Sequence, residues 1–426
     1  MLTNYPELTL DKSARKYGSL YSVCPGNQLF AIVSDLGVAK DLMITQGAMF
    51  SNRKEMFIKS QIVCAGRGIT ATPYNDRWRK PRRIANTWLN QQIVDSYTLV
   101  LDFEATDMLQ GLFAESKNSV AHINPQTYAG RYNIHHPIVA EALRLSRVFM
   151  NCTGPMSNIV DFVPLLQWLP SPLKSKGKAL HRDLVQTYGG MINEIKKKMQ
   201  AGEKVDECLT KTMLDIQQTE ELDYLDTSIL ASAFMIGGVV YRTDPSTPRN
   251  TEARTRRARS GKVERPHNPF WLGTPHTAME DFVYDGKLIP KDTVVVLNTW
   301  TMHHSEKRWD NPLEFNPDRY VKDLLPTSAS ANLADPYARD HWMFGAGRRI
   351  CPGMIVTEPE IWLAISRMLW AFEMVQISER PMNLKEYDGL SGRSPVPFEI
   401  TLKPNFDGVG EVIRKEMKIW KTSSMV

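Results

Sequence analysis

The chain has few cysteines, no long apolar run and little excess charge. Its 426 residues include five cysteines, an odd and small number that excludes a disulfide framework and favours a reducing compartment. The longest uncharged apolar stretch covers residues 227–241, shorter than the roughly 18–20 residues that span a bilayer. The first twenty residues lack the apolar core of a signal peptide. As written, the chain is expected to be soluble and cytoplasmic.

Positive charge is concentrated in one segment. The net charge of +5 at pH 7 is too small to indicate a polyanionic partner, and we expect no nucleic-acid partner. Residues 249–265 hold seven cationic side chains against two acidic ones. The Pro-, Arg- and Ser-rich segment 242–262 is interpreted as a solvated basic linker that replaces helices, with an arm that binds nucleic acid or a protein partner as the alternative.

The spacing of apolar residues predicts a mainly helical chain with a small β-sheet region, an α+β layout. The expected helices cover residues 37–45, 84–109, 138–152, 180–199, 226–237 and 355–372. The expected strands cover residues 22–23, 29–33 and 398–402, with a hairpin over 282–297 turned by Asp285-Gly286. A composition of 42% hydrophobic and 23% charged residues excludes wholesale disorder.

A glycine-rich loop with one cysteine directly precedes an expected helix. Gly345, Gly347 and Gly353 allow positive φ angles and a close approach of the backbone to a flat ligand. Cys351 lies beside the first turn of the helix, where the helix dipole and free N–H groups favour a thiolate. Such a loop can hold a metal-bound sulfur.

Two further side chains of this loop suit the same ligand. Arg349 can pair with an anionic group, and Phe344 can cover the sulfur and limit the access of water. The pattern Phe344-x-x-Gly347-x-Arg349-x-Cys351-x-Gly353 resembles the haem-binding signature of the cytochrome P-450 monooxygenases. The alternative is a buried free cysteine in a glycine turn.

The resemblance implies one cytochrome P-450-like domain over residues 1–426, incomplete at 242–262 and ending in a tail at 405–426. It implies haem b as the cofactor, with the Cys351 thiolate as the axial iron ligand. It also implies electrons from NADPH, delivered by an NADPH-cytochrome reductase as partner. A full-length relative with an N-terminal anchor would lie at the endoplasmic reticulum membrane, and we expect the chain to be a monomer.

Other segments resemble the same family in the expected order. Trp78 and Arg82 resemble its Trp-x-x-x-Arg helix, whose indole N–H and guanidinium bind a haem propionate, although Pro81 lies inside this helix. His276 resembles the residue that offers a side chain to a propionate from a turn. Arg319 resembles the arginine of the Phe-x-Pro-x-Arg block. A surface helix, a satisfied histidine and a loop arginine are the structural alternatives.

Two segments depart from the family pattern. Lys262 occupies the acid position of the family's Glu-x-x-Arg helix, which would place Lys262, Arg265 and Arg319 together without an acid. Val240 and Tyr241 occupy the positions of the acid–threonine pair that relays protons to oxygen. We therefore expect no intact catalytic relay in this chain.

Substrate and function follow from the resemblance alone. The phrases at 50–53, 300–304 and 389–393 resemble fungal members that hydroxylate small aromatic acids and phenols, and residues 63–69, 234–238 and 394–397 are candidate pocket segments. The first interpretation is a monooxygenase that uses O2 to hydroxylate a small aromatic or phenolic metabolite in fungal secondary or aromatic metabolism. The alternatives are a truncated or mis-spliced non-catalytic remnant, and a haem-binding protein with a basic interaction arm.

Overall fold

The structure is a computed structural model of the whole chain. It describes residues 5–70, 72–96, 98–116, 121–123, 137–154, 158–161, 163–205, 208–217, 219–237, 268–320, 325–381, 383, 387–388, 394–396 and 398–423.

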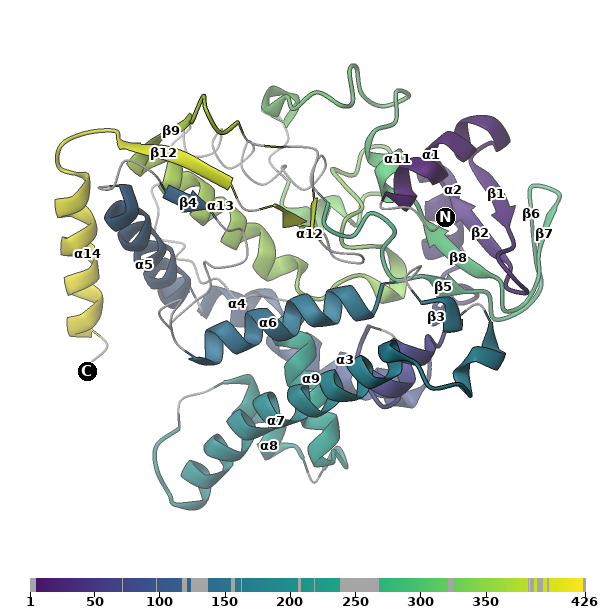
Figure 1. Ribbon diagram of the computed structural model, residues 1–426, viewed down its shortest axis with the longest axis horizontal. Helices are drawn as coiled ribbons and strands as arrows, with labels where there is room; N and C mark the ends of the chain where they lie inside the picture. The colour runs from purple at the N-terminus through teal and green to yellow at the C-terminus, as the bar shows by residue number, and fades with distance from the viewer. Residues whose placement is uncertain are drawn as a thin grey trace.

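A five-stranded mixed sheet forms one end of the molecule (Figure 1). Its strands are β1 (Leu20–Val23), β2 (Phe30–Val33), β8 (Val294–Leu297), β5 (His276–Thr277) and β3 (Asn52–Arg53), in that spatial order. β2 and β8 pair in parallel and every residue of both strands is buried, as expected for β-branched runs covered on both faces. The antiparallel pairing of β3 with β5 aligns Arg53 with His276.

The predicted hairpin over residues 282–297 belongs to two sheets. β6 (Phe282–Tyr284) and β7 (Lys287–Ile289) form a hairpin, and Asp285 and Gly286 have φ angles of 47° and 71°, as a type I′ turn requires. The turn is confirmed. The buried run that follows is β8 of the five-stranded sheet, because an apolar strand needs neighbours that cover it.

Helices make up most of the rest of the described chain. The α-helices are α1 (Pro6–Tyr17), α2 (Leu36–Lys40), α3 (Asp76–Trp88), α4 (Gln91–Ser96), α5 (Thr98–Ser116), α6 (Pro137–Cys152), α7 (Pro172–Gln200), α8 (Leu209–Asp215), α9 (Tyr224–Gly237), α11 (Thr299–His303), α12 (Thr327–Ser330), α13 (Met354–Ala371) and α14 (Val409–Ser423). The π-helical segments are η1 (Asp41–Thr45) and η2 (Phe57–Val63), and the 3-10 segments are η3 (Ile159–Asp161), η4 (Pro164–Gln167), η5 (Pro317–Tyr320) and η6 (Gly347–Arg349).

The helix predicted over residues 84–109 is wrong as a single element, because it is divided into parts of α3, α4 and α5. Asn90 explains the first break: its side chain accepts a hydrogen bond from the Ile93 N–H at 3.0 Å and donates one to the Thr87 carbonyl at 2.7 Å. Such a residue caps a new helix and ends the previous one. The helices predicted at 138–152 and 355–372 are confirmed as α6 and α13.

A second sheet lies at the far end of the molecule (Figure 1). It holds β4 (Ala121–Ile123), β12 (Phe398–Pro404) and β9 (Phe372–Gln376), and β10 (Tyr387–Asp388) pairs separately with β11 (Ser394–Pro395). Leu402 of β12, Leu109 of α5 and Ile413 of α14 share one apolar core. Residues 405–426, predicted as a tail, therefore contain a helix that packs against α5.

α6, α7 and α9 pack against one another, and α7 also packs against η2, around a shared core that includes Leu145, Leu184 and Ile229. Within the described ranges, no helix is both long and apolar enough to cross a membrane. α13 extends from the thiolate loop toward the second sheet, so the loop lies between the two sheets (Figure 1).

Candidate functional site

The glycine-rich loop before α13 folds back on itself. The backbone N–H of Cys351 donates to the carbonyl oxygen of Phe344 at 2.9 Å. Gly345 and Gly347 have φ angles of 74° and 63°, as predicted. A Cβ at Gly347 would overlap the carbonyl oxygen of Met43 in η1, so glycine is required for the loop to lie against this segment.

Gly353 differs from the prediction. Its φ of −73° lies in the right-handed helical region, and it is the cap of α13. The expectation of a positive φ here is wrong, because the backbone already takes helical angles one residue before Met354. A Cβ at Gly353 would lie 3.6 Å from the Sγ of Cys351, which is ordinary contact.

The thiol of Cys351 lies at the start of α13. Burial is the largest influence on the pKa of this thiol and raises it, whereas hydrogen bonds from the N–H groups of Gly353 and Met354 and the positive charge of Arg82 lower it. The side chain is surrounded by protein yet keeps accessible surface.

Arg349 is a buried cation beside this loop. The carbonyl oxygens that accept its hydrogen bonds are those of Ser51 at 2.8 Å, Ile69 at 3.3 Å and Thr72 at 2.5 Å. Its guanidinium lies 4.2 Å from the ring centre of Trp78, a cation–π arrangement. Burial, and secondly the charge of Arg82, lower the pKa of Arg349 to about 9.

Arg53 joins the same cluster and was not predicted as a site residue. Its side chain is buried, it donates to the carbonyl oxygen of Thr274, and its Nε has no hydrogen-bond partner in the described structure. Burial, and then the charge of Arg349, lower the pKa of Arg53 well below its usual value. The burial of Arg53 depends on the pairing of β3 with β5, which the sequence does not reveal. The one sequence feature that could have pointed to Arg53 as a site residue is its place in the segment Phe50-Ser-Asn-Arg53, which resembles a segment of the family.

His276 lies next to Arg53 across the β3–β5 pair, where the sequence predicts a ligand-facing histidine. Its Nδ1 lies 2.7 Å from the carbonyl oxygen of Phe50. Burial and then the charge of Arg53 hold the pKa of His276 well below its usual range. The imidazole is therefore neutral at pH 7, with Nδ1–H as the donor to this carbonyl.

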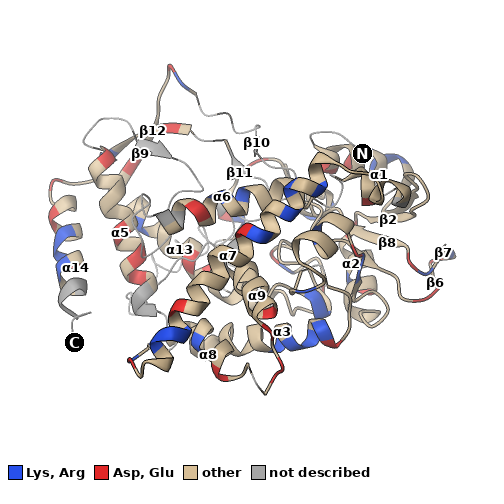
Figure 2. Ribbon diagram, turned by 60° about the horizontal axis from the view of Figure 1, so that its bottom comes forward, with Lys and Arg blue, Asp and Glu red and all other residues tan. Residues whose placement is uncertain are grey.

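Trp78 and Arg82 lie on α3, which runs through Pro81 without a break. The indole N–H of Trp78 donates to the carbonyl of Ile69 at 3.1 Å, so it meets the loop that also receives Arg349. Arg82 lies close enough to Cys351 for their charges to interact, and burial lowers its pKa. A cavity of about 500 Å³ lies along one side of α3. The residues that line it are Trp78, Arg79, Arg82, Arg83, Asn86, Thr87 and Asn90. The blue ribbon of α3 in Figure 2 marks its Lys and Arg residues.

The predicted charge network is only partly described. Arg319 donates to the carbonyl oxygens of Asp310 at 2.6 Å and Asn311 at 2.9 Å, and so holds its own loop. Lys262 and Arg265 lie outside the described residues, as do the relay positions Val240 and Tyr241. The absence of an acid beside Arg319 and the loss of the relay therefore stay predictions.

The cations around Cys351 have no acidic partner among the residues that the structure describes. In the part of the chain that the structure describes, no carboxylate forms an ion pair with Arg53, Arg82 or Arg349, and the Nε of Arg53 is buried without a partner. Buried cations without acids are costly unless a ligand supplies the negative charge. The site therefore fits a ligand that offers anionic groups to the arginines and a metal to the thiolate.

The cytochrome P-450 family model matches residues 3–240 and 264–402, well over half of the chain. The chain belongs to the cytochrome P-450 family. Residues 241–263, between the two matched ranges, include the basic segment 242–262. Membership makes the protein a monooxygenase and implies a haem whose iron is bound by a thiolate.

Relatives are found among fungal proteins and solved structures. The chain is 25% identical to the cytochrome P-450 monooxygenase virE of Hypocrea virens, over 96% of this chain and 83% of the relative. It is 27% identical to the cytochrome P-450 monooxygenase patH of Aspergillus clavatus, over 87% and 79%. A zebra fish cytochrome P-450 with progesterone has a TM-score of 0.73 at 20% identity, over 94% of this chain and 99% of that one. The fold is therefore that of a cytochrome P-450.

Proposed function

We propose that this P-450 hydroxylates a small aromatic or phenolic metabolite in fungal secondary or aromatic metabolism, with electrons passed from NADPH by a reductase. The observation that supports the haem-thiolate part is the position of Cys351 at the start of α13, next to cations that have no acidic partner among the described residues. When bound, haem supplies the iron centre at which oxygen is activated.

The residues of the chain have separate tasks in this proposal. Cys351 would ligate the iron, and the N–H groups of Gly353 and Met354 would stabilise the charge on its sulfur. Arg53, Arg349 and Arg82 would hold the carboxylates of the haem edge. The predicted contact of His276 with a propionate would require a proton on Nε2, because Nδ1–H is already donated to the Phe50 carbonyl. The indole of Trp78 keeps the guanidinium of Arg349 in place by stacking.

The aromatic substrate is supported by the sequence resemblance and by one feature of the packing. Two candidate pocket segments meet, because Ile69 and Phe234 of α9 pack against the same apolar cluster. Apolar side chains beside the loop whose Ile69 carbonyl receives Arg349 suit a flat, largely apolar substrate. Titration of the purified haem protein with phenol, phenylacetate and an aliphatic acid of similar size should give a Soret shift with the aromatic compounds. A response to the aliphatic acid alone would contradict the aromatic assignment.

Cys351→Ala tests the iron ligand. The reduced wild-type protein with carbon monoxide should show the red-shifted Soret band of thiolate ligation, and the variant should lose it because no thiolate remains. Cys24→Ala, which changes an exposed cysteine of the β1–β2 turn, is the matched control and should keep the band. A band that persists in Cys351→Ala would refute the assignment.

The predicted loss of the proton relay is tested by coupling. Val240 cannot transfer a proton and Tyr241 is bulky, so we expect NADPH oxidation to give mostly peroxide or superoxide and little hydroxylated product. Val240→Asp combined with Tyr241→Thr should raise the product formed per NADPH. Tight coupling in the wild type would show that another group delivers the protons.

A further inference from the structure

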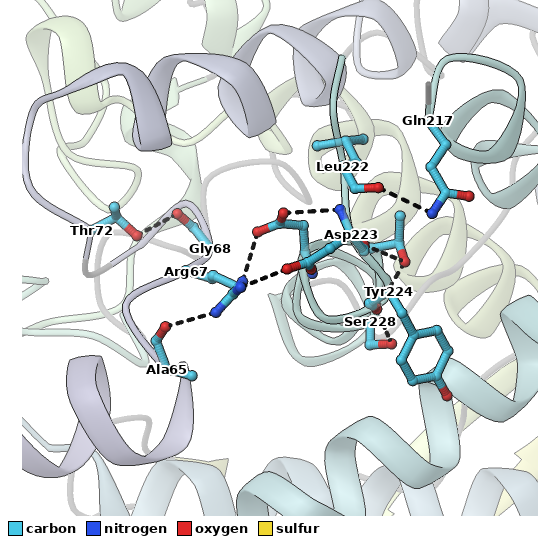
Figure 3. Close-up of polar contacts among 11 residues, drawn as sticks. Ala65, Arg67, Gly68, Thr72, Gln217, Leu222, Asp223, Tyr224 and Ser228 are labelled. Carbon is cyan, nitrogen blue, oxygen red and sulfur yellow. Dashed lines mark hydrogen bonds and ion pairs between the residues drawn. The ribbon is translucent and has the colours of Figure 1, made fainter. Parts of the chain in front are cut away.

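One arginine links the loop before α3 to the first turn of α9. Arg67 Nη2 lies 2.7 Å from Asp223 and its Nε lies 2.8 Å from Asp226 (Figure 3). Although burial acts to lower it, hydrogen bonds with these two carboxylates raise the pKa of Arg67. A guanidinium held by two acids has a defined orientation, which a single flexible pair would not give.

The two acids are themselves fixed at the start of α9. The N–H of Asp226 donates to Asp223 Oδ1 at 2.6 Å, and the N–H of Asp223 donates to Asp226 Oδ2 at 3.2 Å. This reciprocal arrangement satisfies N–H groups that have no partner within the helix. Arg67 therefore binds a rigid part of the helix.

The loop that carries Arg67 adopts an unusual backbone. Ala65, Gly66 and Gly68 have φ angles of 49°, 73° and 96°, and a positive φ is unfavourable for alanine. A Cβ at Gly68 would lie 3.4 Å from Ile229 Cγ2 of α9, so the loop runs close to the helix. The contacts of Arg67 help to maintain a conformation that the backbone alone would not favour.

The other end of this loop supports the cation cluster. The carbonyl of Ile69 accepts hydrogen bonds from the indole of Trp78 at 3.1 Å and from Arg349 at 3.3 Å. The carbonyl of Thr72 accepts from Arg349 at 2.5 Å, and the Thr72 hydroxyl donates back to Gly68 at 2.6 Å. Only Gly68 lies between Arg67 and Ile69, the first residue whose carbonyl group makes these contacts.

We infer that Arg67 is a positioning residue of the haem site: by tying its loop to Asp223 and Asp226 it holds the Ile69 and Thr72 carbonyl groups that aim Arg349 and Trp78. This inference rests on the proposed binding of haem beside Cys351. Arg67 itself touches neither Cys351 nor the buried cations in the described contacts. Its effect must therefore travel through the loop.

The test compares Arg67→Gln with Arg144→Gln in the haem-loaded protein. Arg144 is a matched control because it also binds two acids, Glu141 at 2.6 Å and Asp183 at 2.7 Å, but links α6 to α7. Haem release is followed by transfer to an excess of an apo-haem protein. Arg67→Gln should speed release about tenfold, within the range for substitutions along a coupled network. Arg144→Gln should leave the rate within about twofold.

Two more variants keep the test decisive. Arg67→Lys keeps the charge but cannot bind both acids in a fork, so its release rate should lie between those of the wild type and Arg67→Gln. Asp223→Asn removes only the more exposed acid and should be folded even if Arg67→Gln is not; we expect release about threefold faster.

The outcomes separate this inference from the proposed function. A wild-type protein that holds no haem, or lacks the thiolate band, would overturn the haem assignment and this inference with it. A wild type that holds haem, with release rates in Arg67→Gln or Asp223→Asn equal to those of Arg144→Gln, would overturn the role of Arg67 alone.

Discussion

Arginines in two regions of the molecule have opposite surroundings. Beside Cys351, Arg53 and Arg349 are buried, bind backbone carbonyl groups and have lowered pKa values. In the helical region, Arg67 and Arg144 are partly exposed, each lies between two carboxylates, and each has a raised pKa. Arginine thus links elements of the fold in one region and provides cations for a ligand in the other.

The difference indicates which arginines are arranged for a ligand. An arginine between two acids is already neutralised and links two elements of the fold. A buried arginine without an acid is a cost to folding that remains until an anion arrives. Arginines with lowered pKa values that lie beside a potential metal ligand therefore indicate the binding site more clearly than a cavity does.

The largest effect is expected from Gly347→Ala, which tests whether the thiolate loop places Arg349 in the buried region. The new Cβ would overlap the Met43 carbonyl, so the loop must move away from η1. We expect a loss of roughly 3–5 kcal/mol in the free energy of unfolding, the range for severe substitutions, together with loss of haem. Urea unfolding and the haem-to-protein ratio would measure both.

Gly345→Ala is the matched control for this prediction. Gly345 has a similar φ of 74°, but a Cβ there would meet no atom within 4 Å. Only the cost of a positive φ applies, about 1–2 kcal/mol. Equal losses in the two variants would mean that the contact with η1 does not set the position of the loop.

Sequence reasoning found what local patterns encode. The spacing from Phe344 to Gly353 predicted the thiolate loop, and helical periodicity predicted α13. Arg53 was missed because its burial depends on a strand partner more than 200 residues away, which no local pattern reveals. The break at Asn90 was missed because apolar residues continue on both sides of a polar cap.

A smaller effect is expected when pH is lowered, because protonation of His276 changes the free energy of unfolding. Its pKa in the folded state lies well below the ordinary value near 6.5, so the unfolded chain binds a proton that the folded chain does not. This group makes the protein less stable as pH falls below about 6.5. Between pH 7 and 5.5 its contribution should be a loss of about 1 kcal/mol.

His276→Asn isolates this contribution, because asparagine can still donate to the Phe50 carbonyl but does not titrate. Burial raises the pKa of Asp161 to about 6, so this group makes the protein more stable as pH falls. Asp161 is present in both the wild type and the variant, so its contribution cancels when their pH profiles are subtracted. The variant should lose about 1 kcal/mol less than the wild type between pH 7 and 5.5 in urea unfolding. Identical pH profiles would show that the pKa of His276 is the same in the folded and the unfolded chain.

The smallest effect is expected from Arg144→Gln, and it tests the other half of the comparison. The side chain of Arg144 is 48% exposed, and its partners Glu141 and Asp183 are 35% and 26% exposed, so water and salt screen both pairs. Removing the arginine leaves two acids that water can still solvate, whereas removing Arg349 would leave buried carbonyl groups without donors. We expect Arg144→Gln to lower the free energy of unfolding by less than about 1 kcal/mol, and by less still at 1 M salt. If urea unfolding instead showed a loss as large as that of Arg349→Gln, the surroundings of the two arginines would not determine their cost, and the acid-free cluster could no longer be taken as a sign of an anionic ligand.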